Sequence, residues 1–246
     1  MGMAAAREVA ERIRDVLAQK ESISMVFAAA PSQNEFLAAL RSAPGLDWSR
    51  VSAFHLDEYI GLPCESPQSF GRFLKDSLFD WVRPGKVYFL NGDANDPHEE
   101  CTRYARLLMD NPIDIACIGI GENGHIAFND PHVADFQDPR SLKVVELDQR
   151  CRVQQVHDGC FSALEQVPSH ALTMTIPAIM AAECIYCIVP GPTKQEAVKR
   201  TLEGPITTAC PASVLRTHPC VVLFLDRRAA STLESVRVDG VDGRDE

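Results

Sequence analysis

The stretch DIACIGIGENGHIAFNDP, residues Asp114 to Pro131, joins a strand-like run to a group of polar side chains. The run from Ile113 to Ile120 has the length and the Ile-rich character of a buried strand. It breaks into glycines, at which the backbone can turn sharply or approach a ligand closely: Gly119, Gly121 and Gly124. His125, Asn129 and Asp130 follow directly. Open α/β sheets bind ligands at the carboxyl ends of their strands, so this stretch predicts a site there.

The three glycines also match the dinucleotide-binding fingerprint, G-x-G-x-x-G. That fingerprint should open a helix, whereas Pro131 limits any helix after Gly124 to about two turns. The nucleotide interpretation is therefore disfavoured. A second alternative is a tight turn with His125 packed in the core. It explains the glycines but not the density of polar groups.

Apolar runs alternate with amphipathic segments along the whole chain. The pattern predicts strands at 23–30, 51–56, 87–90, 113–120, 143–147, 171–175, 184–189 and 221–225. Helices are expected at 4–20, from 32 through 40, at 67–81, from 97 through 108, at 177–182 and from 191 to 204, with weak helical character at 150–165. This alternation predicts an α/β fold, with a single doubly wound, mostly parallel sheet flanked by helices, Rossmann-like. The chain is expected to form one domain, 1–246, with a frayed tail at about 236–246.

The composition excludes some partners. The formal net charge is −10, which argues against nucleic acid as a main partner, since phosphate backbones are bound by basic surfaces. No apolar run approaches the length of a membrane span, and the N-terminus lacks the apolar core of a secretory signal. The nine cysteines are odd in number and show no framework spacing, so a cytoplasmic protein with reduced thiols is expected. Cys184 and Cys187 have CxxC spacing but lie in an apolar run, which favours strand residues over a redox pair.

Several polar residues stand at expected strand and helix ends. Ser32 could cap a helix through a capping box with Glu35, or it could bind an anion at that helix start. Asp57 and Glu58 follow a strand, and because neighbours on an extended chain point opposite ways, at most one should enter a given site. Lys194 lies in the expected first turn of a helix, where a cation opposes the macrodipole unless an anion is bound. The irregular stretch from 131 to 141 is long enough for a lid or binding loop.

Four stretches together resemble the glucosamine-6-phosphate deaminase/isomerase family. They are FHLDEYIGL at 54–62, GIGENGHIAFNDP at 119–131, ALTMTI at 171–176 and Gly191-x-x-Lys194, and the resemblance covers nearly the full chain. The second stretch is long and specific, and the other three are individually weak. The wider superfamily also includes 6-phosphogluconolactonases and sugar-phosphate-sensing domains of transcriptional regulators.

The resemblance implies an aldose–ketose isomerisation coupled to loss of ammonia, with a sugar-phosphate substrate and without cofactor or metal. Asp57 matches the base that moves a proton from C2 of the opened sugar to C1, and His125 matches the group that opens the ring. Asn123 and Asp130 match positions that orient and polarise this histidine. Further residues match phosphate-contacting positions: Ser32, Lys194 and, in a poorly aligned region, Lys143. Members of this family can be hexamers, which leaves a homo-oligomer open.

The chain departs from the family pattern mainly where phosphate would bind. It has Ala30-Pro31-Ser32 where typical deaminases have a Gly-Gly-Thr-like loop, and Pro31 has no N–H to donate. Gln155 occupies the position of an arginine that the deaminases use on the phosphate. The family usually has Glu at the position of Asp130, and some members have an acidic residue at the position of Asn123. The hexosamine epimer therefore stays open, as does a less charged substrate.

Two other function classes remain. A 6-phosphogluconolactonase-type hydrolase would carry a G-x-D-G-H-x-A-S loop, and Asn123 and the run from Phe128 to Pro131 argue against it. A sensor would carry a DNA-binding domain ahead of this fold, and only about 20 residues precede the first expected strand. A non-catalytic sugar-phosphate-binding protein is the remaining alternative.

Overall fold

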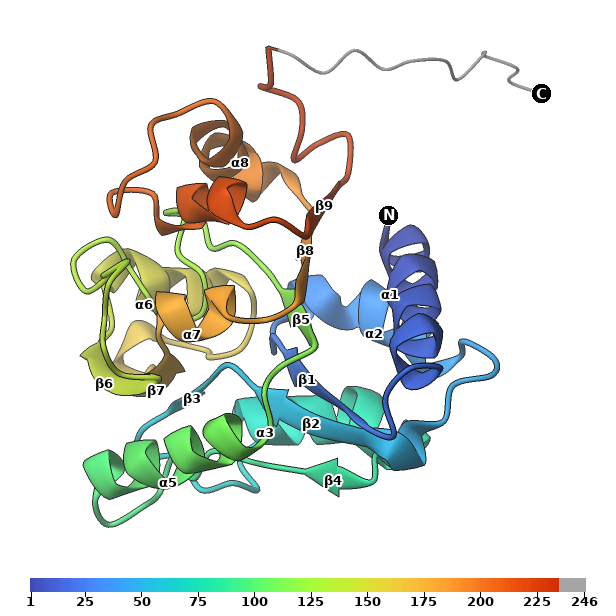
Figure 1. Cartoon of the computed structure of the whole chain (residues 1–246). Helices are drawn as coiled ribbons and strands as arrows, with labels where there is room; N and C mark the ends of the chain where they lie inside the picture. Colours follow the sequence, from blue (N-terminus) through green and yellow to red (C-terminus); the bar gives the residue numbers. More distant parts are fainter. Residues whose placement is uncertain (235–246) are drawn as a thin grey trace.

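The computed structural model describes residues 1–234, and its larger β-sheet contains six parallel strands (Figure 1). Their spatial order is β4-β2-β1-β5-β8-β9. The strands are β1 (Ile23–Phe27), β2 (Val51–His55), β4 (Lys86–Val87), β5 (Ile115–Ile118), β8 (Cys184–Val189) and β9 (Val221–Leu225). The predicted mostly parallel α/β sheet is therefore confirmed.

The strand order reverses direction next to the first strand. The chain adds β2 and then β4 on one side of β1, and β5, β8 and β9 on the other. In open α/β sheets the crevice at such a switch point, outside the carboxyl ends of the strands, is where ligands bind. Here it lies beyond the ends of β1 and β5, at the glycine-rich stretch that follows Ile118.

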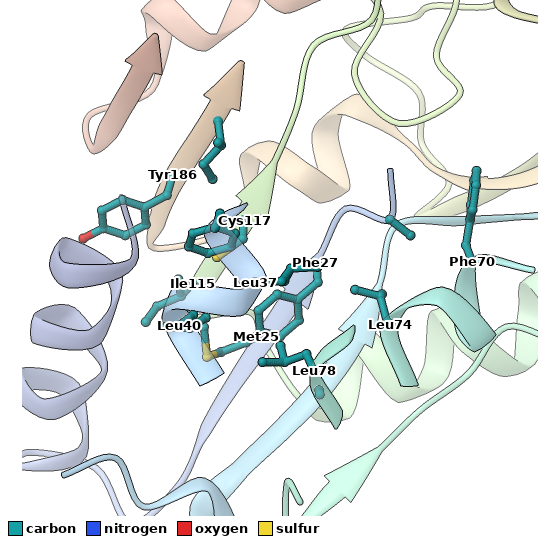
Figure 2. Packing of buried hydrophobic residues seen from close by; sticks show 14 of the residues in the cluster. Met25, Phe27, Leu37, Leu40, Phe70, Leu74, Leu78, Ile115, Cys117 and Tyr186 are labelled. Atoms are coloured by element: carbon teal, nitrogen blue, oxygen red, sulfur yellow. The ribbon is translucent and has the colours of Figure 1, made fainter. Parts of the chain in front are cut away.

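Helices cover both faces of this sheet. The helices of residues 1–234 are α1 (Gly2–Leu17), α2 (Asn34–Arg41), α3 (Phe70–Leu74), α4 (Asp80–Val82), α5 (Pro97–Asp110), α6 (Gln149–His157), α7 (Ile176–Met180) and α8 (Gln195–Leu202). On one face Met25, Phe27 and Ile115 pack in a cluster with residues of α1 and α2 (Figure 2). On the other face Val26 and Ala116 pack with residues of α5, α7 and α8. Strands β1, β5 and β8 are buried throughout, as expected for a parallel sheet that is covered twice.

A second, antiparallel sheet of three strands was not predicted. Its order is β3-β7-β6, formed by β3 (Asp57–Tyr59), β7 (His170–Met174) and β6 (Leu142–Glu146). The two apolar runs at 143–147 and 171–175 were recognised as strands, but a run of five residues does not reveal its partner. Only Leu56 separates the end of β2 at His55 from the start of β3 at Asp57, so the chain passes directly from one sheet to the other.

The helix start after β1 differs from the prediction. A 3-10 turn, Pro31–Gln33, comes first, and α2 begins at Asn34 without a side-chain cap. The predicted capping box between Ser32 and Glu35 is therefore wrong. Proline fixes φ and starts the turn at Pro31, so the α-helix begins beyond Ser32. By contrast, Asp96 caps α5 as expected for a residue before Pro97: its carboxylate accepts hydrogen bonds from two backbone N–H groups.

The segment predicted as one helix at 67–81 is built from three pieces. They are α3, a π-helical turn at Lys75–Phe79, and α4. Apolar residues of this segment nevertheless pack on one side, since Phe70, Leu74 and Leu78 are buried in the cluster of Figure 2. Further 3-10 turns lie at Trp48–Arg50, Leu164–Gln166, Pro192–Lys194 and Pro211–Thr217.

One pair of cysteines corrects the expectation of reduced thiols. Cys184 and Cys220 form a disulfide, with their Cα atoms 4.9 Å apart. They come together because Ile185 pairs with Val221, which sets the two preceding residues side by side on β8 and β9. The other seven cysteines are free, and Cys187 is buried within β8, so the CxxC spacing belongs to strand residues as predicted.

The expected frayed tail, about 236–246, lies outside the described residues. Among the helices of residues 1–234, none is long and apolar enough to cross a membrane.

Candidate active site

A cavity of about 70 Å³ lies at the switch point of the parallel sheet. The loops after β1, β2 and β5 form most of its wall, α6 supplies two amides, and the 3-10 turn before α8 supplies an ammonium group. Its polar lining consists of Ser32, Gln33, Asp57, His125, Gln154, Gln155 and Lys194. Segments far apart in the sequence thus bring a carboxyl group, an imidazole, a lysine and several amides to one place.

Asp57 is the carboxyl group of this cavity. It begins β3 directly after the crossing between the sheets, and its side chain is 7% exposed. Burial raises the pKa of Asp57 well above the ordinary carboxyl range, and the negative charge of Glu58 adds to the effect. A carboxylate with a raised pKa is a better match for proton transfer near neutral pH than an exposed one.

Glu58 faces away from the cavity, as the alternation of an extended chain predicts. Its carboxylate accepts hydrogen bonds from the backbone N–H groups of Tyr59, Phe70 and Gly71 and from the Ser69 hydroxyl, at 2.7–3.1 Å. These donors surround the N-terminus of α3, where a negative charge is favoured. Glu58 therefore anchors a helix, and only Asp57 of the adjacent pair enters the cavity.

Asn123, His125 and Asp130 form a connected group. The Asn123 amide donates to Asp130 Oδ1 at 2.8 Å, and its carbonyl oxygen accepts from the His125 backbone N–H at 3.0 Å. His125 Nδ1 lies 2.8 Å from Asp130 Oδ1, although the ring N–H is not well directed at that oxygen. Burial alone would raise the pKa of Asp130, but the interactions with His125 and Asn123 outweigh it and lower the pKa. A carboxylate that stays ionised beside the ring can orient and polarise it.

The loop that carries His125 depends on its glycines and on Asn129. A Cβ on Gly121 would lie 2.2 Å from the His125 ring, and Gly124 has a φ of +89°. The Asn129 amide is fully buried and donates to the carbonyl oxygens of Ile126 and Met174, which ties the loop to β7. The glycines therefore make room for the imidazole, and no helix opens after them, in agreement with the disfavoured nucleotide interpretation.

Lys194 supplies the positive charge of the cavity. It ends the 3-10 turn Pro192–Lys194, and its side chain is 5% exposed. Burial lowers the pKa of Lys194, while the charges of Asp158 and Glu122 act in the opposite direction. Within residues 1–234 no carboxylate lies within 4.0 Å of its ammonium. A buried ammonium without such a partner is costly, and an anion in the cavity would compensate it.

Lys143 is the predicted phosphate contact that the structure does not bring to this cavity. It lies on β6, and its ammonium donates to the Val133 carbonyl at 2.6 Å and pairs with Asp138 at 3.2 Å. It lines a separate hollow of about 720 Å³ between α5, β6 and α7. The loop from 131 to 141 therefore lies against β6 and holds Lys143 there, and none of its residues lines the cavity of Asp57.

Two amides of the site were not singled out in the sequence. Gln33 is 1% exposed and donates to the Ile188 carbonyl, while its buried Oε1 has no hydrogen-bond partner in the described part of the chain. Gln154 accepts from the Glu122 backbone N–H at 3.0 Å and so links α6 to the glycine-rich loop. The position of Gln33 just after a strand end is a signal that could have found it. No comparable signal marks Gln154, because it lies within a helix of mixed character.

Comparison with known proteins gives the family. The family model of "Glucosamine-6-phosphate isomerases/6-phosphogluconolactonase" matches residues 1–223. The chain belongs to this family. It is 40% identical over 227 residues to a glucosamine-6-phosphate deaminase of Bacillus thuringiensis (strain Al Hakam), which covers 92% of this chain and 84% of the relative. An equally similar deaminase is found in Bacillus cereus (strain AH820).

Solved structures agree with this assignment. A monomeric glucosamine-6-phosphate deaminase superposes with a TM-score of 0.85 at 32% identity, over 94% of each chain. The 6-phosphogluconolactonase of Thermotoga maritima superposes with a TM-score of 0.73 at 19% identity, over 89% of this chain and 92% of that one. At that identity the second likeness establishes the fold alone. Within its family, this chain is thus similar in sequence and structure to the deaminases.

Proposed function

We propose that this protein is a glucosamine-6-phosphate deaminase, which converts an amino-sugar phosphate into a ketose phosphate and ammonia. The observation that carries the proposal is that one cavity contains Asp57, His125 and Lys194. A base, a proton-transferring imidazole and a buried cation are the groups that the reaction needs. The 40% identity to deaminases over most of the chain supports the same activity.

The proposed role of Lys194 is to bind the phosphate. Its buried ammonium lacks a carboxylate partner in the described residues, and Ser32 and Gln155 line the same cavity. A charge-assisted hydrogen bond in such a place contributes about 1.5–3 kcal/mol. The sugar would then be fixed at one end, with its C1 and C2 atoms toward Asp57 and His125.

The proposed chemistry uses two proton transfers. His125 takes the proton of the C1 hydroxyl and delivers it to the ring oxygen, which breaks the C1–O5 bond and gives the open aldehyde. Asp57 takes the C2 proton while one proton of the C2 ammonium group passes to O1, so that a C1–C2 enolamine forms. Asp57 then returns its proton to C1. The C2 amine is then an iminium group, which water hydrolyses to the ketone with release of ammonia. Asn123 and Asp130 would hold the imidazole in position through the contacts described above.

Ammonia release is the test of this proposal. Glucosamine 6-phosphate and galactosamine 6-phosphate should be compared in a coupled assay without added metal or nucleotide. Release from one of them would establish the activity and identify the hexosamine epimer. If a folded sample released ammonia from neither but hydrolysed a 6-phosphogluconolactone, the deaminase proposal would be wrong and the lactonase alternative correct.

A further inference from the structure

Cys151 is a buried thiol beside the proposed catalytic group. It lies on α6 with 1% of its surface exposed, and the mechanism above does not use it. One ligand atom each of His125, Asp130 and Cys151 lie within 4.8 Å of one another. Three side chains of the types that ligate metals, from two separate segments, therefore lie close to one another.

The donor set selects a class of cation. An imidazole, a carboxylate and a thiolate are the ligands that Zn²⁺ and related soft or borderline ions accept, whereas Mg²⁺ and Ca²⁺ prefer oxygen atoms alone. Three protein ligands leave a fourth tetrahedral position for water or another small ligand. The cluster therefore has the composition of an open zinc site.

The imidazole of His125 is in a state that a cation would satisfy. Its Nδ1 is buried and has no well-directed hydrogen-bond partner in the described part of the chain, although it lies 2.8 Å from Asp130 Oδ1. The Asn123 amide donates to Oδ1 of Asp130, the oxygen that faces His125, and the Asp148 backbone N–H donates to Oδ2. Such hydrogen bonds orient metal-ligating carboxylates in known sites. The two ligands are thus already fixed toward each other.

The cluster lies between two openings. His125 lines the cavity that holds Asp57, and Cys151 lines a neighbouring hollow of about 490 Å³ bounded by the glycine-rich loop and α6. Gln154 lines both. Two of the three ligands therefore each border a hollow, and Asp130 is buried between them.

We propose that His125, Asp130 and Cys151 bind one soft divalent cation, of which Zn²⁺ is the reference case, and that the bound cation inhibits the enzyme. Binding breaks the S–H bond of Cys151 and forms a metal–sulfur bond, and the released proton goes to solvent without any change of oxidation state. The imidazole then ligates the cation and no longer moves protons. The inhibitory half of this inference rests on the proposed deaminase activity, whereas the binding half does not.

The test uses Zn²⁺ and Co²⁺ as probes, with variants of a residue outside the proposed mechanism. Wild-type protein is expected to bind one Zn²⁺ per chain in equilibrium dialysis and to give a thiolate-to-metal absorption band with Co²⁺. Cys151→Val should lose the band, weaken Zn²⁺ binding about tenfold or more, and keep ammonia release in the absence of metal. Cys151→Ser, which preserves the size of the side chain, should behave in the same way and guards against misfolding of the valine variant. The matched control is Cys64→Ser, at an exposed free cysteine, which should change nothing.

Each outcome decides one half of the proposal. An unchanged Co²⁺ band and unchanged Zn²⁺ affinity in both Cys151 variants would overturn the site, as would a wild-type protein that binds no Zn²⁺. Loss of binding in the variants with equal zinc inhibition would overturn the inhibitory role alone. Cys151-dependent binding in a protein that releases no ammonia would retain the metal site and reject the deaminase activity.

Discussion

Lys143 and Lys194 are equally buried, each 5% exposed, yet they lie in two regions with opposite electrostatics. Lys143 pairs with Asp138 beneath the loop at 131–141, so its charge is compensated by the protein. Lys194 lines the cavity at the end of the parallel sheet, and residues 1–234 offer its ammonium no carboxylate within 4.0 Å. Burial is thus common to both regions. What distinguishes a site from a structural pair is the missing partner, which a ligand can supply.

The carboxyl groups of the two regions differ in the same way. Contacts with Arg140 and Lys143 lower the pKa of Asp138 to about 2, so this group is ionised at any working pH. Burial and the charge of Glu58 raise the pKa of Asp57 well above the ordinary carboxyl range. The protonated form is therefore favoured at Asp57 and the ionised form at Asp138, which suits a proton shuttle in one place and an ion pair in the other.

The largest expected effect is a loss of kcat when Asp57, but not its neighbour Glu58, is replaced. Asp57→Asn should lower kcat for ammonia release by about 10²–10⁴-fold, because it removes the proposed general base and keeps the shape of the side chain. Binding of the sugar phosphate should change little. Steady-state kinetics, with binding measured by calorimetry, would check both points. A variant with wild-type kcat would remove Asp57 from the mechanism.

Glu58→Gln is the matched control for that variant. It should leave kcat within a few-fold of wild type and lower stability by about 1–3 kcal/mol, because the charge that accepts four hydrogen bonds at the start of α3 is lost. Denaturant unfolding of both variants would separate the roles. Equal losses of activity in the two variants would show that Asp57 has no role in the reaction that Glu58 lacks.

The second prediction compares the two lysines. Lys194→Met should raise KM by about 10- to 100-fold and lower kcat less, because it removes a charge-assisted contact made before the chemical step. Lys143→Met should leave KM unchanged. It should lower the free energy of unfolding by only about 1–3 kcal/mol, because Asp138 loses one ionic partner but still pairs with Arg140. Kinetics and unfolding of both proteins test the contrast. A raised KM in the Lys143 variant would restore that residue as a phosphate contact.

A third prediction concerns how much charge the cavity supplies to a phosphate. Lys194 is the one Lys or Arg in the described lining, and Gln155 is a neutral amide of the same lining. Gln155→Arg adds a second cation, which should lower KM for the phosphorylated sugar about 2- to 5-fold, as expected for one partly screened charge contact. Gln155→Lys is a matched control with less capacity for bidentate contact. An unchanged KM in both variants would mean that Gln155 is not near the phosphate.

The sequence predicted the fold class well because its signals are local. Apolar runs such as Cys184–Val189 and Ile115–Ile118 mark buried strands whatever their partners, and Pro97 with Asp96 marks a helix start. The second sheet was missed because pairing is a long-range property: His170–Met174 reads the same whether it lies in a parallel or an antiparallel sheet. The disulfide was missed for the same reason, since Cys184 and Cys220 are 36 residues apart and meet only through strand register.

The residues of the site also divide into those that local motifs predict and those that depend on long-range contacts. Asp57, His125, Asn123 and Asp130 lie in motifs next to strand ends, and the structure gathers them where the sheet order reverses. Lys143 was placed by alignment across an irregular loop, and its pairing with Asp138 could not be read from either residue. Cys151 carries no motif at all, because its significance comes from two ligands on another segment.

The smallest expected effect is one of stability, and it tests the electrostatics of Asp57 without any substrate. A carboxyl group whose pKa is raised on folding stabilises the protein below its unfolded pKa, and this contribution is lost as pH rises through the folded pKa. Above that pH the wild-type protein carries a buried charge that Asp57→Asn lacks. The Asp57→Asn variant should therefore have a Tm a few degrees above that of the wild type at pH 8, and the difference should be smaller at pH 5. Thermal unfolding of both proteins across this range measures the difference. A gain that did not depend on pH would mean that the pKa of Asp57 is not raised by folding, and the contrast with Asp138 would then rest on geometry alone.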